Sequence, residues 1–401
     1  MFTYLTAGES HGKEITAIIK QVPAGLKIKK DLIDQELIRR QGGYGRGGRM
    51  DIEKDRVEIT AGVRHGITLG SPITLVIENK DWENWQKEMS PEPADGKETE
   101  AATKPRPGHA DLAGALKYNT KDVRNILERA SARETAIRTA VGSVCKQFLS
   151  KFDINIYSHV IQIGSVKASS WQNLDVTDKR SGEYNQEKLG KYFKKVEDSP
   201  LRCGNKEVEK EMIKLIDDTK QKGDSIGGMI EILVFGLPVG LGSHIHWDEK
   251  LDGKLAQALI SIQAIKGVEF GAGFKSAKLR GSKVHDEIYY EQDSSQFYRS
   301  SNQAGGIEGG ISNGEPLLIR MAMKPIPTLK NPLHSVDIKS KETRFASKER
   351  SDVCAVPSAS IVGEAVASAV LARVFSKKFG GDSMQEIHRN YQSYMDYLKH
   401  Y

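Results

Sequence analysis

A segment with a continuous apolar face, residues 129–152, constrains the fold of this chain most strongly. Its apolar side chains recur every three or four residues, which places them on one side of a helix and requires that side to be buried. Ser131 and Glu134 have the spacing of a capping box and predict that the helix begins there. The apolar face consists of Ile137, Val141, Val144, Phe148 and Phe152.

The predicted start of this helix carries an unusual concentration of positive charge. Arg129, Arg133 and Arg138 lie in or near its first turns, where the helix dipole disfavours cations. This arrangement costs stability unless an anion binds there. A local conflict of this kind is typical of a functional site.

Other periodic segments predict a mixture of helices and strands. Alternating apolar residues over 72–78 and 317–323, with a short segment at 3–5, indicate strands. Helical patterns cover 31–41, 251–265, the Ala- and Val-rich segment 360–375, and the C-terminal 384–401. We therefore expect an α+β fold, formed by residues 1–401 as one large domain.

Three polar regions lack the pattern of core elements. Residues 79–107 and 281–303 are rich in prolines or aromatic residues without a usable period, and we interpret them as mobile loops beside an active site. Residues 160–222 are strongly charged and are interpreted as a peripheral insertion with a solvated surface.

A segment rich in arginine and glycine, 39–51, connects a predicted helix to a predicted strand. It reads RRQGGYGRGGRMD. Glycine allows the backbone to approach a ligand closely, and arginine binds phosphates and carboxylates through a planar, permanently charged group. The residues alone allow an anion site, a solvated linker or an RNA-binding tract. Its position between two regular elements argues against a free linker.

Two histidines lie in glycine-bearing turns next to acidic residues. His11 follows Glu9 in GESHG, and His109 lies between Arg106 and Asp111 in RPGHAD. Such turns can present an acid–base group, although a single histidine can also be a structural turn residue. Together with the arginines, they favour an enzyme acting on a polyanionic small molecule.

Composition excludes several other classes of protein. The net charge of +6 arises from 59 basic and 53 acidic residues, which favours local anion sites over a general nucleic-acid surface. The three cysteines are far apart and form no CxxC motif, so we expect buried thiols and neither a disulfide framework nor a metal site. We see no signal peptide, and the apolar run 360–375 is short and interrupted by Glu364, so we expect a cytoplasmic protein without a membrane span. We see no GxGxxG followed by a helix and a distal acid, no Walker lysine and no GxSxG elbow at Ser10 or Ser131.

Nine motifs in a fixed order make the chain resemble the chorismate synthase family over nearly its whole length. One departure is Ser351, where family members usually have a histidine between an arginine and an aspartate. A second is the glycine-rich arginine segment, where many members have an RRPGQ-like sequence. The motifs are GESHG, RRQGGYGRGGRM, RPGHAD, RASARETA, GDSIGG, AIKGVEFGAGF, SNGEP, KPIPT and RSD.

This resemblance implies a fold, a reaction and a cofactor. The fold is a sandwich of antiparallel sheets and helices, assembled as a homotetramer. The reaction is the 1,4-anti elimination of phosphate from 5-enolpyruvylshikimate 3-phosphate, which gives chorismate in the last step of the shikimate pathway. It requires reduced FMN although the net change is not redox, and NADPH is a possible reductant of the flavin.

The resemblance also implies residue roles. His11 would serve the departing phosphate, His109 would stabilise the protonation of the flavin, and Asp352 would help the flavin to accept the substrate proton. Arg40 and Arg46 occupy positions associated with NADPH. Arg46, Arg49, Arg133 and Arg350 would bind substrate. The residues implied to contact FMN are Ser131, Ala132, Arg133, Gln263, Ala264, Gly309, Lys324, Pro325, Ile326, Pro327, Thr328 and Arg350.

Two other functions are weighed against this one. An RNA-binding protein would use the arginines at 40–49 and exposed aromatic residues, and its affinity would depend steeply on salt. A flavin reductase would act on a different anion. Neither accounts for the GESHG, RPGHAD and RASARETA motifs together.

Overall fold

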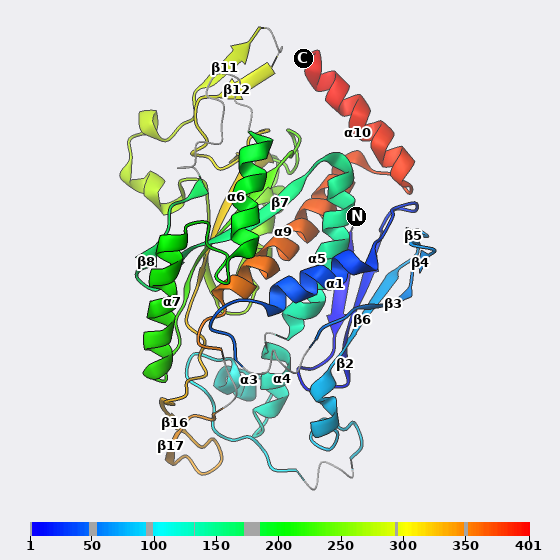
Figure 1. Ribbon diagram of the computed structural model, residues 1–401. Helices are drawn as coiled ribbons and strands as arrows, with labels where there is room; N and C mark the ends of the chain where they lie inside the picture. The colour runs from blue at the N-terminus through cyan, green and yellow to red at the C-terminus, as the bar shows by residue number, and fades with distance from the viewer. Residues whose placement is uncertain are drawn as a thin grey trace.

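Two antiparallel sheets enclose a layer of helices in the computed structural model (Figure 1). The structure describes residues 2–47, 54–93, 99–131, 133–171, 185–292, 296–348 and 352–401. Among these residues the helices α5 (Glu134–Leu149) and α9 (Val356–Phe379) form the centre of the core. The predicted α+β sandwich is thereby confirmed.

The first sheet has four strands in the order β1-β2-β6-β3. They are β1 (Thr3–Ala7), β2 (Glu14–Lys20), β6 (Ile73–Glu78) and β3 (Glu58–Ala61). Ile15, Ala17 and Ile19 of β2 are buried against the helices, whereas Ile18 between them is exposed. This alternation is the pattern of a sheet with one face in solvent.

The second sheet has five strands in the order β10-β15-β9-β7-β8, and both of its faces are covered. Ile232 of β9 belongs to the main core, whereas Leu233 belongs to a smaller cluster under α6 (Gln186–Asp198). The five strands are β7 (Asn155–Ile163), β8 (Val166–Lys167), β9 (Gly228–Phe235), β10 (Ile265–Phe270) and β15 (Leu317–Met323).

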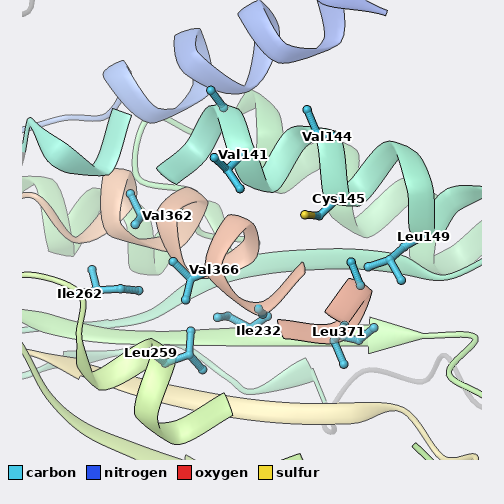
Figure 2. Close-up of a cluster of buried hydrophobic side chains, with 14 of the residues drawn as sticks. Val141, Val144, Cys145, Leu149, Ile232, Leu259, Ile262, Val362, Val366 and Leu371 are labelled. Carbon is cyan, nitrogen blue, oxygen red and sulfur yellow. The ribbon is translucent and has the colours of Figure 1, made fainter. Parts of the chain in front are cut away.

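The central helices α5 and α9 pack unusually closely. A Cβ atom built on Gly142 of α5 would lie 2.3 Å from the Cβ of Ala365 in α9, so only glycine permits this approach. Figure 2 shows Val141 and Val144 of α5 above Val362 and Val366 of α9, with Ile232 of β9 below them.

Further helices complete the core and its surroundings. They are α1 (Lys30–Gln41), α3 (Asp111–Lys117), α4 (Arg124–Ala130), α7 (Lys206–Gln221), α8 (Leu251–Ile260) and α10 (Met384–Lys399), with the 3₁₀ helices η1 (Lys80–Asn84), η3 (Ser150–Phe152), η5 (Trp247–Glu249), η6 (Gly273–Lys278) and η7 (Gly281–Lys283). Short hairpins are formed by β4 (Val63–Arg64) with β5 (Ile67–Thr68), β11 (Ile288–Glu291) with β12 (Gln296–Arg299), β13 (Ile307–Glu308) with β14 (Ile311–Ser312), and β16 (His334–Val336) with β17 (Thr343–Phe345).

Two predictions about helix ends are wrong. Ser131 is the C-terminal cap of α4, and α5 begins only at Glu134, although the Ser131 hydroxyl accepts from the backbone N–H of Arg133 at 3.3 Å. The sequence pattern had merged two helices that meet at this junction. The helix predicted over 251–265 ends at Ile260, because Ala264 adopts a left-handed conformation with φ of 65° and Ile265 begins β10.

The polar regions contain more regular structure than their patterns indicate. Residues 160–163 belong to β7, so the charged insertion begins after that strand. The region 79–107 contains η1, and 281–303 contains η7 and the β11–β12 hairpin. The mobility of these two regions stays a prediction.

Helix α9 is longer than its apolar pattern suggested. It has 24 residues and is apolar enough to cross a bilayer by length and composition, but 83% of its most apolar window is buried inside the protein. The argument from its short length was therefore wrong. Its burial against α5, β7 and β9 accounts for its hydropathy.

Candidate active site

A cavity of about 960 Å³ lies where the loops at one end of the sandwich meet. It is bordered by the turn after β1, the region around η1, the α4–α5 junction, the segments after α8 and β15, and the start of α9. Figure 1 shows α3 and α4 at this end, below α5. Its volume is at the upper end of the range for small-molecule sites, about 300–1,000 Å³.

Most of the predicted site residues line this cavity. Pro325 and Gly309 do not. Gly310, the neighbour of Gly309, packs against Lys250 at the start of α8, whereas Gln263 follows the end of that helix. Ten helical residues separate the two positions by about 15 Å. The residues brought together are His11, Arg40, Arg46, His109, Ser131, Arg133, Gln263, Ala264, Lys324, Ile326, Pro327, Thr328 and Asp352. Arg49, Ala132 and Arg350 lie outside the described residues.

His11 is held by a buried carboxylate from a distant part of the chain. Its Nδ1 lies 2.8 Å from Oε1 of Glu128 on α4, and its backbone N–H donates to Oε2 of the same side chain at 2.7 Å. Burial raises the pKa of Glu128, but the hydrogen bonds and charge of His11 outweigh this and leave the pKa below its usual range. The carboxylate bonded to His11 is therefore supplied by Glu128, 117 positions away in the sequence.

Trp85 covers the His11 ring. The two ring centroids are 4.0 Å apart and the planes are 30° from parallel. The guanidinium of Arg124, on α4, lies 4.9 Å from the Trp85 ring and 3.4 Å from Glu128. His11 is therefore fixed in orientation by both an ionic and an aromatic contact.

His109 has an analogous arrangement within its own turn. Its Nδ1 lies 2.5 Å from Oδ1 of Asp111, and Arg106 donates to the other oxygen of Asp111 at 2.9 Å. Arg106 also donates to Thr328 at 3.0 Å. Burial raises the pKa of Asp111, but His109 and Arg106 outweigh it and hold the pKa well below its usual range. This carboxylate is therefore ionised and orients the imidazole.

Two arginines at the cavity share one buried carboxylate. Arg40 donates to Oδ2 of Asp55 at 3.0 Å, and Arg133 donates to Oδ1 of the same residue. Burial lowers the pKa of Arg40 to about 10, although Asp55 acts in the opposite direction. Arg133 also donates to Asn79 at 2.7 Å. These cations are partly neutralised and rigidly held before any ligand binds.

Arg46 links the arginine- and glycine-rich segment to the start of α9. It donates to Oδ2 of Asp352 at 2.6 Å, and the backbone N–H of Gly47 donates to Oδ1 at 2.7 Å. In the next turn, the N–H of Val353 donates to the carbonyl of Gly45 at 2.8 Å. The predicted catalytic Asp352 thus lies on the cavity wall with a defined orientation. Because Arg40 is 3% exposed and Arg46 is ion-paired, they form no open basic surface, which disfavours the RNA-binding alternative.

The part of the lining formed by Gln263, Ala264 and Lys324 has features that fit a bound flavin phosphate and ring. The Oε1 atom of Gln263 is buried and lacks a hydrogen-bond partner among the described residues, so it can accept from a ligand. Ala264 adopts its left-handed conformation here, at a cost of about 1–3 kcal/mol that is typical of functional sites. Lys324 donates to the carbonyl of Gly108. The open acceptor of Gln263 and the cation of Lys324 suit the polar ring edge and the phosphate of the cofactor implied by the sequence.

Cations outnumber acids on the lining of the cavity. The cationic residues among the described part of the lining are Arg40, Arg46, Arg106, Arg133 and Lys324, and the acidic ones are Asp81, Glu88 and Asp352. A positive, partly enclosed cavity attracts polyanions. Elsewhere in the described ranges, no group of three or more His, Cys, Asp or Glu residues is placed to hold a metal ion.

Several residues of this site were missing from the sequence-based assignment. Arg106 and Asp111 were visible beside His109 in the RPGHAD motif. The other three, Asp55, Trp85 and Glu128, gave no local signal. The site residues that they hold, Arg133 for Asp55 and His11 for the other two, are more than 70 positions away in the sequence. Only the folded chain brings them to the histidines and arginines.

The fold and the site together define an enzyme for a polyanionic small molecule, with two histidines oriented by carboxylates. The family model described as chorismate synthase matches residues 2–375. The chorismate synthase of Geotalea daltonii is 54% identical over 407 residues and that of Aquifex aeolicus 54% over 396, with at least 98% of each chain covered. A crystal structure of chorismate synthase matches with a TM-score of 0.78 at 44% identity, covering 100% of this chain and 99% of the other.

The chain therefore belongs to the chorismate synthase family. Enzymes of this family are lyases that eliminate phosphate from 5-enolpyruvylshikimate 3-phosphate in the final step of the shikimate pathway, and they use reduced FMN.

Proposed function

We propose that the cavity at this end of the sandwich is where this chain eliminates phosphate from 5-enolpyruvylshikimate 3-phosphate, with His11, His109 and Asp352 as its catalytic residues. The observation that carries the proposal is the convergence of two carboxylate-held histidines and a cluster of cations on one cavity. The substrate has two carboxylates and one phosphate, so a site with this charge suits it. The whole chain, 1–401, would act as one catalytic domain.

The arginines would bind and orient the substrate. We assign Arg46, Arg133 and, outside the described residues, Arg49 and Arg350 to its phosphate and carboxylates. A guanidinium forms two parallel hydrogen bonds to such groups. Because Arg133 is already fixed by Asp55 and Asn79, little side-chain freedom would be lost on binding.

Reduced FMN, when bound, supplies electron density as phosphate departs and recovers it when the proton is lost. Ser131, Arg133, Gln263, Ala264, Lys324, Ile326, Pro327 and Thr328 would hold it, as would Ala132 and Arg350. Gly309 and Pro325, which the sequence also assigns to the cofactor, do not line this cavity in the single chain.

The catalytic residues would manage two departing groups. His11 would hold a proton towards the phosphate oxygens and so stabilise the charge that develops as the C–O bond breaks. Asp352 would take part in removing the C–H proton, in an orientation set by Arg46 and Gly47. His109, held by Asp111, would stabilise the protonation state of the cofactor.

We also propose NADPH as a possible reductant of the flavin, with Arg40 and Arg46 as its contacts, and a cytoplasmic homotetramer as the working form. Replacing dithionite by NADPH in an anaerobic assay tests the first point. Sedimentation velocity tests the second, and a monomer at assay concentration would contradict it.

The test of function is an anaerobic assay with dithionite-reduced FMN and 5-enolpyruvylshikimate 3-phosphate, which follows the appearance of chorismate. We expect His11→Ala and His109→Ala each to lower kcat at least about tenfold, as is typical for acid–base groups. His246→Ala is the matched control, because His246 also contacts an aspartate, Asp248, but on the surface. Turnover near wild type in both folded site variants would refute the assigned roles. Flavin oxidation without chorismate formation would favour a reductase.

A further inference from the structure

We propose that Glu128 is a positioning residue for catalysis, which fixes His11 so that Nδ1 faces the carboxylate and Nε2 serves the ligand in the cavity. This inference rests on the proposed role of His11. The geometry that points to it is a two-point clamp, in which one carboxylate binds both the backbone and the ring of the same histidine.

The clamp determines which ring nitrogen carries the structural proton. The carboxylate of Glu128 can only accept hydrogen bonds when ionised, and its depressed pKa keeps it ionised. The Nδ1 of His11 must therefore be protonated, and proton donation towards the cavity falls to Nε2.

The surroundings of the clamp restrict alternatives to this orientation. Trp85 stacks on the ring at 4.0 Å, so rotation of the imidazole would break an aromatic contact as well as an ion pair. The charged groups around the pair are Arg124, which is 3.4 Å from Glu128 on the same helix, and Asp81 of η1, which accepts from Trp85 Nε1 at 3.2 Å. Arg124 keeps Glu128 ionised, and Asp81 holds the tryptophan in place.

Glu128 is more than a structural counter-ion, because both of its oxygens contact His11: Oε1 lies 2.8 Å from Nδ1, and Oε2 accepts from the backbone N–H at 2.7 Å and lies 3.1 Å from Nδ1. Glutamine keeps the size of the side chain but removes the charge and replaces one acceptor oxygen by an NH₂ donor, so Glu128→Gln can hold the backbone N–H and Nδ1 only through one neutral oxygen. Glu128→Asp keeps the charge but is one methylene shorter.

The chain contains a matched control for the loss of a buried histidine–carboxylate pair. His159 Nε2 lies 2.9 Å from Glu231 Oε1, and both side chains are at most 1% exposed. Neither residue lines the cavity. Glu231 also pairs with an arginine, Arg320, at 2.9 Å, as Glu128 does with Arg124. Glu231→Gln therefore removes a buried carboxylate from a histidine and an arginine outside the site.

The experiment is a double-mutant cycle of Glu128→Gln and His11→Ala in the anaerobic chorismate assay. We expect Glu128→Gln to lower kcat at least about tenfold, with KM changed less than about threefold, because the loss is in the transition state. Glu128→Asp should recover part of kcat, and Glu231→Gln should keep the wild-type kcat.

The cycle separates positioning from stability. If Glu128 acts through His11, adding Glu128→Gln to His11→Ala lowers kcat no further. Independent, multiplicative losses, or a loss that appears in KM and not in kcat, would overturn the inference while leaving His11 as the acid. Wild-type turnover in His11→Ala would overturn both the inference and the proposed role of His11.

Discussion

Asp55→Asn tests whether the buried arginines are held by a carboxylate that a ligand can replace. Asp55 pairs with Arg40 and Arg133, and the side chains of all three are at most 4% exposed. Asparagine retains the shape of the side chain but leaves two buried guanidinium groups without a counter-charge. The variant should therefore be folded but less stable.

The expected magnitude follows from the burial of the pair. Removing one partner of a buried ion pair costs about 3–5 kcal/mol. For 401 residues the unfolding entropy is about 0.84 kcal/mol/K, from about 2.1 cal/mol/K per residue. The Tm should therefore fall by about 4–6 °C.

The assay is thermal unfolding with and without inorganic phosphate. An anion at one hundred times its Kd stabilises the folded state by about 2.7 kcal/mol, or about 3 °C on the scale above. We expect a larger phosphate-induced rise in Asp55→Asn than in wild type, because phosphate can occupy the position of the lost charge. Glu197→Gln is the control, since Glu197 also joins two arginines, Arg39 and Arg202, but is 41% exposed and distant from the cavity.

Two results would refute this reasoning. An unchanged Tm in Asp55→Asn would show that the two arginines do not depend on this carboxylate. An equal phosphate-induced shift in wild type, Asp55→Asn and Glu197→Gln would show that phosphate binds elsewhere. A small loss of about 0–1 kcal/mol is expected for the exposed control.

Two further predictions concern stability. Gly142→Ala should destabilise the chain by about 1–3 kcal/mol, because its Cβ would lie 2.3 Å from that of Ala365. Gly190→Ala, on α6 with nothing within 4 Å, should stabilise it by up to about 1 kcal/mol. Changes of the same sign in the free energy of unfolding, measured in urea, would contradict this. Stability should also fall as pH drops below about 4.5. Burial raises the pKa of Glu364, but Arg39, Lys146 and Arg202 outweigh it and leave the pKa below its usual value. A carboxylate whose pKa is lower in the folded than in the unfolded chain contributes stability above the unfolded pKa and loses it as pH falls. Urea midpoints that stay constant from pH 6 to pH 3 would exclude this.

Periodicity predicted the elements that bury one face or all faces. The strand at Leu317–Met323 was predicted with its observed ends, and the apolar face from Ile137 to Phe152 is buried as expected. Helix ends were less predictable. The apolar spacing continued through Ile262 to Ile265, but a left-handed residue between them starts a new strand.

The site residues were predicted from local motifs, and their partners were not. Arg133 was recognised because a cation at a helix start is unfavourable, and the sequence indicated that an anion was needed. Part of that anion is Asp55, 78 positions away, which no local pattern connects to the helix. Similarly, His11 was recognised in its turn, but Glu128 is 117 positions away.

These distant carboxylates imply that charge and geometry are controlled separately in this site. Asp55 neutralises cations that would bind an anionic ligand, so its removal should strengthen the response to phosphate even as it weakens the empty fold. Glu128 orients a proton donor, so its removal should weaken turnover without strengthening anion binding. A larger phosphate response in Asp55→Asn than in wild type, with no such increase in Glu128→Gln, would therefore distinguish a counter-ion that a ligand can replace from a carboxylate that must stay in place during the reaction.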